Sequence, residues 1–203
     1  MIELHLANSG NSLRAAIALE ECGLPYKKHV LDLEAREHKR PDFLRLNPFG
    51  TVPVMVDPDG PEGAPITLSQ SGLIMLYAAE RSGLFLPRRK TDRLAAMQWF
   101  MAAVADAAPA NAIMKYFGQN APDPSEANRR YLEGRLLALL DSFEEQLGEK
   151  EFLLGEITVA DLALFPIIHL RSELVAASDR FSSLLGWYDR LRTREAVRRA
   201  MVL

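Results

Sequence analysis

A proline that interrupts a β-rich run constrains the fold of this chain more than any other feature, and it lies in the stretch of residues 47–56. Proline inside a strand removes a donor from the hydrogen-bond ladder, so Val52 and Pro53 are expected at a bend or a sheet edge. If their peptide bond is cis, the backbone groups of Val52 can pair with an extended ligand as an added strand would. Gln70 and Ser71 then open an amphipathic helix, whose free N–H groups and positive end suit a carboxylate. Together the two segments predict a site for a small acidic peptide.

This combination resembles the glutathione-binding half of the glutathione S-transferase family, and the resemblance covers most of the chain. Beside the segments above, it includes the opening strand at residues 2–6, the helical stretch at residues 12–26 and the sequence Thr-Val-Ala-Asp-Leu-Ala at residues 158–163. The members that it resembles most are bacterial ones of the nu-like, theta-like or beta-like kind.

The resemblance implies an α/β domain of thioredoxin-like fold over residues 1–82, a linker over residues 83–90 and an all-α helical-bundle domain over residues 91–203. It also implies glutathione as co-substrate, a small apolar or disulfide second substrate, and a homodimer. The implied activity is attack of the glutathione thiol on an electrophile, a disulfide or a peroxide. The alternative is a binding module that keeps this fold without catalysis.

The hydrophobic pattern predicts a mixed first part and a helical second part. In the second part, Pro109 is expected to kink the first helix, and residues 120–124 are expected to form a turn between the first two helices. In the first part the expected strands are residues 2–7, 27–33, 52–56 and 66–68, and the expected helices are residues 11–23, 41–45 and 71–81.

The composition is that of an ordinary soluble globular protein, with 48% hydrophobic and 25% charged residues among 203 and a net charge of −3. This charge gives no overall attraction to nucleic acid, and the apolar runs are broken well short of the ~20 residues that cross a membrane. The single cysteine, Cys22, cannot form an internal disulfide, and no basic-then-apolar leader opens the chain, so a cytoplasmic protein is expected. A basic run is expected to be the solvated face of a terminal helix: Arg190, Arg192, Arg194, Arg198 and Arg199.

The chemistry implied by the resemblance requires a donor that stabilises the glutathione thiolate. A free thiol has a pKa of ~8.5, and lowering it by about two pH units takes ~2.7 kcal/mol. One hydrogen bond to a charged group supplies ~1.5–3 kcal/mol and a helix N-terminus adds ~0.3–1 kcal/mol, so one donor at the start of the first helix is enough. Tyrosine-dependent relatives are excluded as a guide, because the first tyrosine is Tyr26, beyond that helix.

Three candidate donors precede or open the first helix: Asn11, Ser9 and Ser12. The resemblance places Asn11 where nu-like transferases also have an asparagine, at the position that cysteine-dependent members fill with cysteine. Cys22 lies farther along the helix and is expected to be a small apolar residue of its buried face. Each of the three polar residues can equally be a helix N-cap. We rank Asn11 first, Ser9 second and Ser12 third.

The resemblance also implies how the rest of glutathione is bound. The backbone of Val52, in the unit Val52–Pro53, would pair with the cysteinyl backbone, while Gln70 and Ser71 would hold the γ-glutamyl end. His38 or Lys39 would bind the glycyl carboxylate. The alternative for His38 and Lys39 is a solvated polar loop without a ligand.

A second substrate is expected against the first helices of the helical domain, where bulky apolar residues gather near Pro109. Most such residues at helical spacing belong to a core, so only part of the group is expected to face a pocket. No metal site is expected, because four scattered histidines and one cysteine have no ligand spacing. The candidates for the second substrate are Trp99, Phe100, Met114, Tyr116 and Phe117.

Thr158 and Asp161 have the spacing of a capping box, in which the first caps a helix and the second reaches back to its first amide. This pair is expected to nucleate a buried helix of the second domain, and its loss should cost about 1 kcal/mol or more. We expect a structural role for Asp161 and none in catalysis.

Overall fold

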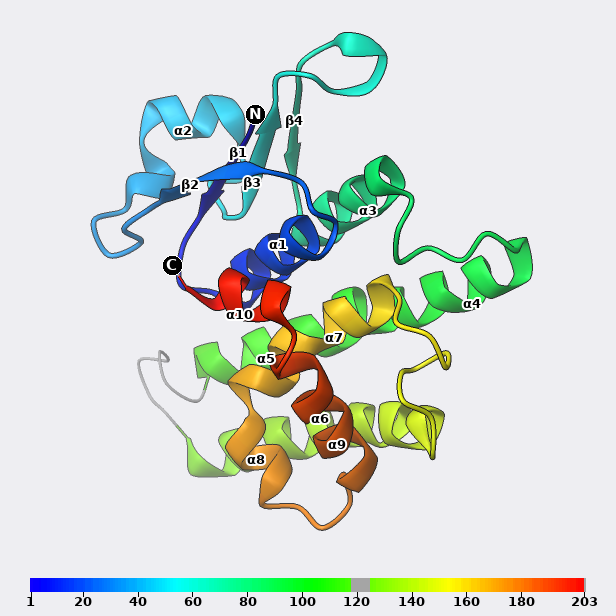
Figure 1. The fold of residues 1–203 in the computed structure, drawn as a ribbon. Helices are drawn as coiled ribbons and strands as arrows, with labels where there is room; N and C mark the ends of the chain where they lie inside the picture. The colour runs from blue at the N-terminus through cyan, green and yellow to red at the C-terminus, as the bar shows by residue number, and fades with distance from the viewer. Residues whose placement is uncertain (118–124, 203) are drawn as a thin grey trace. The chain divides into compact units, whose positions relative to one another are not determined.

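The computed structural model describes residues 1–117 and 125–202. Its contacts divide the chain into two compact units, drawn in Figure 1: residues 1–84 with 192–203, and residues 85–191. The division expected from the sequence, with domains over residues 1–82 and 91–203 and a linker over residues 83–90, stays a prediction. The compact units differ from it because residues 192–203 group with the first unit. The turn expected at residues 120–124 lies outside the described residues.

The first unit contains a four-stranded mixed sheet of strand order β2-β1-β3-β4. Strand β1 (Ile2–Leu6) runs parallel to β2 (Tyr26–Val30) and antiparallel to β3 (Val54–Asp57), and β3 runs antiparallel to β4 (Ile66–Ser69). With the helix α1 (Gly10–Glu21) between β1 and β2, this order is the thioredoxin-like arrangement that the sequence predicted. Three expected strands are shorter in the structure, since β1 ends at Leu6, β2 ends at Val30 and β3 begins after Pro53.

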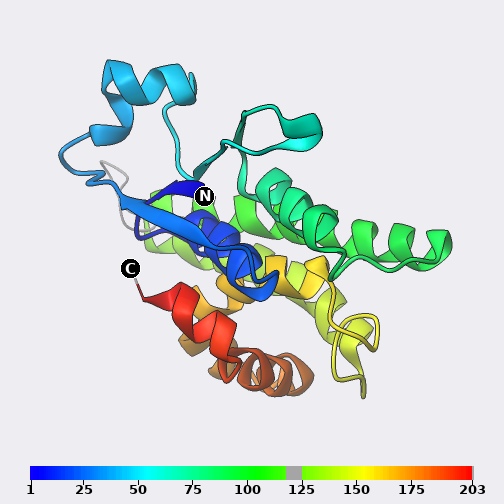
Figure 2. The same cartoon turned by 45° about the horizontal axis from the view of Figure 1, so that its top comes forward.

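Helices cover both faces of this sheet. Helix α1 (Gly10–Glu21) and helix α3 (Ser71–Ser82) pack side by side on one face, and the short α2 (Pro41–Leu46) lies on the other, preceded by a 3₁₀ turn, η1 (Glu37–Lys39) (Figures 1 and 2). The alternation along β1 explains the layers, because successive side chains point to opposite faces. Ile2, Leu4 and Leu6 are buried, whereas His5 meets the ring of Phe43 in α2 edge-on at 6.1 Å.

The C-terminal helix α10 (Glu195–Met201) packs against α1 in the same unit. Arg194 makes two hydrogen bonds with the carboxylate of Glu21, at 2.6 and 2.7 Å, and Arg199 Nε lies 2.8 Å from Glu20 Oε2. The expectation of a solvated basic face holds for the exposed Arg199, whereas Arg194 is half-buried against α1. Their partners lie far away in sequence, in the last turns of α1, so no local pattern pointed to them.

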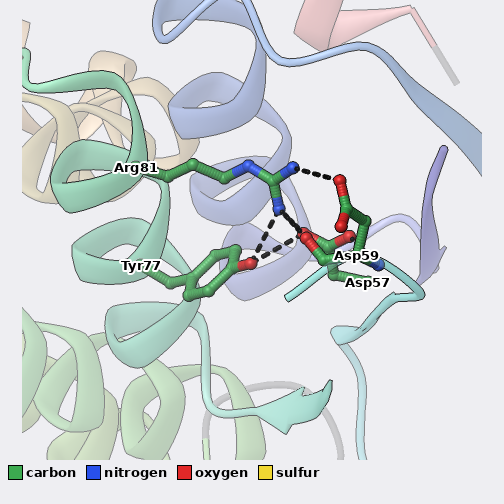
Figure 3. A network of polar contacts seen from close by, with 4 residues as sticks. All are labelled: Asp57, Asp59, Tyr77 and Arg81. Atoms are coloured by element: carbon green, nitrogen blue, oxygen red, sulfur yellow. Dashed lines mark hydrogen bonds and ion pairs between the residues drawn. The ribbon is translucent and has the colours of Figure 1, made fainter. Parts of the chain in front are cut away.

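A polar network fixes α3 to the end of β3 (Figure 3). The buried carboxylate of Asp57 accepts a hydrogen bond from the hydroxyl of Tyr77 at 2.7 Å and forms an ion pair with Arg81. Arg81 also donates to the backbone oxygen of Asp59 at 2.7 Å. Because Tyr77 and Arg81 belong to α3, the network holds this helix, and therefore its N-terminal residues, against the sheet.

We expect Asp57→Ala to lower the free energy of unfolding by about 2–3 kcal/mol, since it leaves the Tyr77 hydroxyl and the Arg81 guanidinium without their shared acceptor. Asp59→Ala is the matched control. The Asp59 side chain is exposed and pairs with Arg81 at only 3.8 Å, so its loss should cost less than about 0.5 kcal/mol. Urea unfolding of both variants measures the difference. Equal losses would show that Asp57 does not organise the network.

The second unit is entirely helical within the described residues. Helix α4 (Lys90–Met101) leads through the π-helical segment η3 (Ala102–Ala107) into α5 (Ala108–Lys115), with Pro109 in the first turn of α5. The expected interruption near Pro109 is thus present, but the irregular turn precedes the proline. The remaining helices are α6 (Glu126–Leu147), α7 (Val159–Leu170), α8 (Ser172–Ala176) and α9 (Ser182–Arg192).

The buried helix α7 is the centre of this unit. The capping box at its start is confirmed, because the Thr158 side chain accepts from Ala160 N at 3.3 Å and Asp161 Oδ2 accepts from Thr158 N at 2.9 Å.

In the described part of the chain, no helix is both long enough and apolar enough to cross a bilayer.

Candidate ligand site at the ends of helices α1 and α3

The turn from β1 into α1 is closed by two serines. Ser9 caps the helix by accepting from Ser12 N at 3.2 Å, and it donates its own hydroxyl proton to Ser12 Oγ at 2.9 Å. Ser12 is buried and also accepts from Ala7 N at 3.1 Å. Both hydroxyls therefore serve the turn itself, and the Ser9 proton is already donated within it.

Asn11 is exposed at the first turn of α1, and its amide orientation follows from its neighbour. Arg14 Nη1 lies 2.7 Å from Asn11 Oδ1. Because a guanidinium can only donate, the atom of Asn11 that faces it must be the carbonyl oxygen. The amide nitrogen then keeps both protons, and no described residue accepts them. Among the three predicted donors, Ser9 already donates within the turn and Ser12 is fully buried, whereas the N–H groups of the exposed Asn11 amide are available to a ligand.

Arg14 is the buried residue that joins α1 to α3. Its side chain is 2% exposed, and the same Nη1 that meets Asn11 lies 3.2 Å from Ser71 Oγ, at the first residue of α3. Burial lowers the pKa of Arg14 to about 10, so its guanidinium is still charged at neutral pH. The N-termini of the two helices, and the polar groups of Asn11 and Ser71, are thus brought to one place within the first unit.

Gln70 precedes α3 with a backbone conformation that non-glycine residues rarely adopt. Its φ is +75° and its ψ is 111°, and its side chain is exposed. Its carbonyl accepts the first hydrogen bond of the helix, from Ile74 N at 3.1 Å. The N–H groups before Ile74 have no partner within the helix, because no helical carbonyl precedes them. Strained backbone of this kind costs about 1–3 kcal/mol and is found mostly at binding and catalytic sites.

We expect Gln70→Gly to keep or raise the free energy of unfolding, by up to about 1 kcal/mol, because glycine tolerates positive φ. Affinity for the ligand of this site should nevertheless fall, since the side-chain amide is removed. Gln70→Ala is the control that loses the amide but keeps the strain. Denaturant unfolding and calorimetric titration separate the two effects. A loss of stability in the glycine variant would show that the side chain of Gln70 supports the fold.

The loop before β3 is held by Asn47 and Lys39. The buried Asn47 amide donates to Thr51 O at 2.7 Å, and its Oδ1 accepts from Phe49 N at 3.2 Å. Lys39 Nζ donates to Gly50 O at 2.7 Å. The loop leads to Val52, whose bond to the following proline is cis and whose backbone groups stay outside the ladders of β3.

His38 and Lys39 take different places in this loop region. Lys39 is committed to the backbone of the loop, while His38 is half-buried and its Nδ1 is shielded from solvent with no partner among the described residues. Burial, followed by the charges of Lys39 and Arg36, lowers the pKa of His38. A neutral imidazole results at pH 7. Whether His38 or Lys39 meets a glycyl carboxylate, or neither does, is not decided by these contacts.

Gly50 is required by both its conformation and its surroundings. Its φ is +56°, and a Cβ there would lie 2.8 Å from Lys39 Nζ and 3.0 Å from His38 O. We expect Gly50→Ala to cost about 1–3 kcal/mol of stability and to displace Lys39. Gly23→Ala is the matched control, with φ +64° and open space around the new Cβ, so it should show the conformational cost alone. Equal losses in urea unfolding would show that the contact with Lys39 does not matter.

Cys22 and the second-substrate candidates lie outside this arrangement. Burial raises the pKa of the Cys22 thiol, in keeping with the expected packing role. In the second unit Phe100 and Met114 are buried, which makes them core residues, and Trp99 packs on Phe143 with ring centroids 5.2 Å apart. Two of the five predicted residues stay largely exposed: Tyr116 and Phe117.

Two residues of the site were missed from sequence. Arg14 carries a charge on the face of α1 that otherwise contains the buried Ala15, Ala18 and Leu19. A charged residue on an apolar helix face is rarely buried without a partner, and this could have pointed to Arg14 from the sequence. Asn47 could have been found as an Asx turn before proline, because its side chain accepts from the backbone two residues on. Among the residues the structure describes, no group of three or more histidine, cysteine or acidic side chains could hold a metal ion.

Comparison with known proteins agrees with this fold. The family models for the N-terminal and C-terminal domains of glutathione S-transferase match residues 8–81 and 110–199. The disulfide-bond oxidoreductase YfcG of Escherichia coli (strain K12) is 30% identical over 206 residues, which cover 100% of this chain and 95% of that protein. The chain therefore belongs to the glutathione S-transferase family.

Solved structures show the same likeness. A glutathione transferase family member from Pseudomonas fluorescens, with two glutathione bound, has a TM-score of 0.91 and 30% identity, covering 98% of this chain and 91% of that chain. A glutathione transferase from Pseudomonas putida, with one glutathione disulfide bound per subunit, has a TM-score of 0.92 and 26% identity, covering 100% and 91%.

Proposed function

We propose that the protein is a glutathione-dependent enzyme that activates the glutathione thiol and directs it at a small disulfide. The observation that carries the proposal is the free amide nitrogen of Asn11 at the start of α1, joined through Arg14 to the start of α3. A thiolate donor and an anion-binding helix end are the two groups that binding and ionisation of this tripeptide require.

In the proposed complex, three parts of the first unit hold glutathione. The γ-glutamyl carboxylate lies at the N-terminus of α3, where Gln70, Ser71 and the free N–H groups of the first turn meet it. The backbone of Val52 pairs with the cysteinyl residue as an added strand. The Asn11 amide donates to the sulfur, and the N-terminus of α1 adds its positive end. His38 or Lys39 binds the glycyl carboxylate.

The proposed reaction is thiol–disulfide exchange in two steps. The bound thiolate attacks one sulfur of the small disulfide, a new S–S bond forms, and the old S–S bond breaks so that the leaving thiolate takes its electron pair and a proton from water. A second glutathione thiolate then attacks the mixed disulfide and releases glutathione disulfide and the second thiol. Support comes from the relative named as a disulfide-bond oxidoreductase and from the neighbours bound to two glutathione molecules or to glutathione disulfide.

Conjugation to an electrophilic carbon is the second candidate function. There the thiolate forms a C–S bond and the leaving group departs with its electron pair. The exposed aromatic residues Tyr116 and Phe117 favour an apolar acceptor, because large exposed hydrophobic side chains commonly mark a binding surface. They are the two predicted second-substrate residues that stay largely exposed, while Trp99 is half-buried.

The proposal includes a cytoplasmic homodimer. The free, buried Cys22 suits a reducing compartment, and the exposed ring of Phe49, which is 72% accessible, suits a contact between copies of the chain.

Calorimetric titration with reduced glutathione and with glutathione disulfide tests binding. Assays of turnover with a small organic disulfide and with an aryl halide, each in the presence of glutathione, then test the reaction. We expect binding of both forms and faster turnover of a small organic disulfide than of an aryl halide. Faster turnover of the aryl halide would favour conjugation. Absence of binding at millimolar concentration of either form would overturn the catalytic proposal and leave a binding module of this fold.

A further inference from the structure

One guanidinium nitrogen contacts two polar side chains that would bind different parts of glutathione, the thiol and the γ-glutamyl carboxylate. Arg14 Nη1 lies 2.7 Å from Asn11 Oδ1 and 3.2 Å from Ser71 Oγ. A guanidinium nitrogen carries two protons, so a single nitrogen can donate to both oxygens. Asn11 is three residues from Arg14 on the same helix, whereas Ser71 is 57 residues away and opens α3.

These two hydrogen bonds decide what Asn11 and Ser71 present to a ligand. Arg14 can only donate, so it holds the oxygen of the Asn11 amide and turns the NH₂ group away from itself. It also occupies an acceptor site of Ser71 Oγ, which leaves the hydroxyl proton of Ser71 for another acceptor. Both side chains are therefore set as donors, one for the sulfur and the other for the γ-glutamyl carboxylate.

Arginine suits this task because its side chain is fixed by burial and its fork is planar. Arg14 is 2% exposed, so its position does not depend on solvent or on a mobile stem. Lysine could reach one of the two oxygens as a point charge, but its shorter side chain and rotating ammonium group do not impose the same two directions.

We propose that Arg14 is a positioning residue that sets the thiolate donor Asn11 and the carboxylate donor Ser71 together. This inference rests on the proposed function. Arg14 itself touches neither sulfur nor carboxylate in this account. It acts on the chemical step through Asn11 and on glutathione affinity through Ser71, so removing it should affect both quantities.

The test compares the wild type with Arg14→Met, Arg14→Lys and Arg81→Met. For each, the thiol pKa of bound glutathione is read from thiolate absorbance, and affinity is measured by calorimetry. Arg14→Met keeps an unbranched apolar stem and should raise that pKa by about one pH unit and weaken affinity about tenfold, while Arg14→Lys should recover part of both. Arg81→Met removes an arginine from the Asp57 network of α3 and leaves Asn11 on α1 untouched, so it should lower stability and leave the thiol pKa of bound glutathione unchanged.

Two combined variants show whether Arg14 acts through its neighbours. In an Asn11→Ala background, Arg14→Met should no longer move the thiol pKa, and in a Ser71→Ala background it should no longer weaken affinity. If Arg14→Met does not fold, the free energies of unfolding of ligand-free Asn11→Ala, Ser71→Ala and the double variant are compared instead. Because Arg14 links the two residues, the loss in the double variant should differ from the sum of the two single losses.

The outcomes separate the inference from the proposed function. A wild type that binds glutathione and lowers its thiol pKa, with an Arg14→Met variant that does the same, overturns the role of Arg14 and leaves the function intact. Fully additive effects in the combined variants overturn it as well. A wild type that leaves the thiol pKa unchanged overturns the proposed function, and the positioning role falls with it.

Discussion

Asn11→Ala should lower kcat/KM for the second substrate, at saturating glutathione and neutral pH, by about 10- to 100-fold. The reason is the loss of one hydrogen bond to the thiolate, which is worth ~1.5–3 kcal/mol. Because this bond favours the ionised thiol, the pH profile of the variant should move upward by about one to two pH units. The variant should approach the wild type at alkaline pH, where the thiol ionises without help.

Ser9→Ala tests the competing assignment, in which Ser9 rather than Asn11 is the thiolate donor. The Ser9 hydroxyl caps α1 and donates to Ser12, so its loss should cost about 1 kcal/mol of stability and leave the pH profile in place. A profile that moves in Ser9→Ala and stays unchanged in Asn11→Ala would transfer the donor role to Ser9. Steady-state rates measured over the neutral to alkaline range distinguish the two results.

Asp161→Ala should lower the free energy of unfolding by about 3–5 kcal/mol, a large share of the ~5–15 kcal/mol that holds a typical protein folded. The carboxylate accepts from Leu153 N at 2.9 Å, Trp187 Nε1 at 3.0 Å and Thr158 N at 2.9 Å, all in the buried centre of the second unit. Alanine leaves these donors without a partner and away from water.

Thr158→Ala is the matched control for Asp161→Ala, because it removes the cap of the same helix and leaves the carboxylate. Its cost should be about 1 kcal/mol, the ordinary value of an N-cap. Denaturant unfolding of both variants measures the difference. Equal losses would mean that Asp161 acts only in the capping box, as the sequence predicted, and that its contacts with Leu153 and Trp187 add nothing.

The sequence predicted the features that depend on residues close together along the chain. The capping box of Thr158 and Asp161 spans three residues, the unit Val52–Pro53 is a dipeptide, and Ser71 lies where the hydrophobic pattern starts the helix α3. Each of these has a local physical cause, namely a cap, a missing donor or a periodicity, so each could be inferred without knowing the fold.

The contacts that organise the site could not be predicted in this way. The bond from Arg14 to Ser71 joins residues 57 positions apart, and the bond from Lys39 to Gly50 depends on how the loop returns to η1. The sequence ranked Asn11 above Ser9 and Ser12 only through the resemblance, because each of the three could equally be a helix N-cap. The structure separates them by showing that the two serines close the turn and that Arg14 fixes the amide of Asn11.

Ultraviolet titration of the thiolate in the complex of the wild-type protein with glutathione shows directly whether the site ionises the bound thiol. Bound glutathione should ionise about two pH units below the ~8.5 of a free thiol, so that most of it is thiolate at neutral pH. Glutathione that binds but titrates as it does in water would contradict thiol activation by this site.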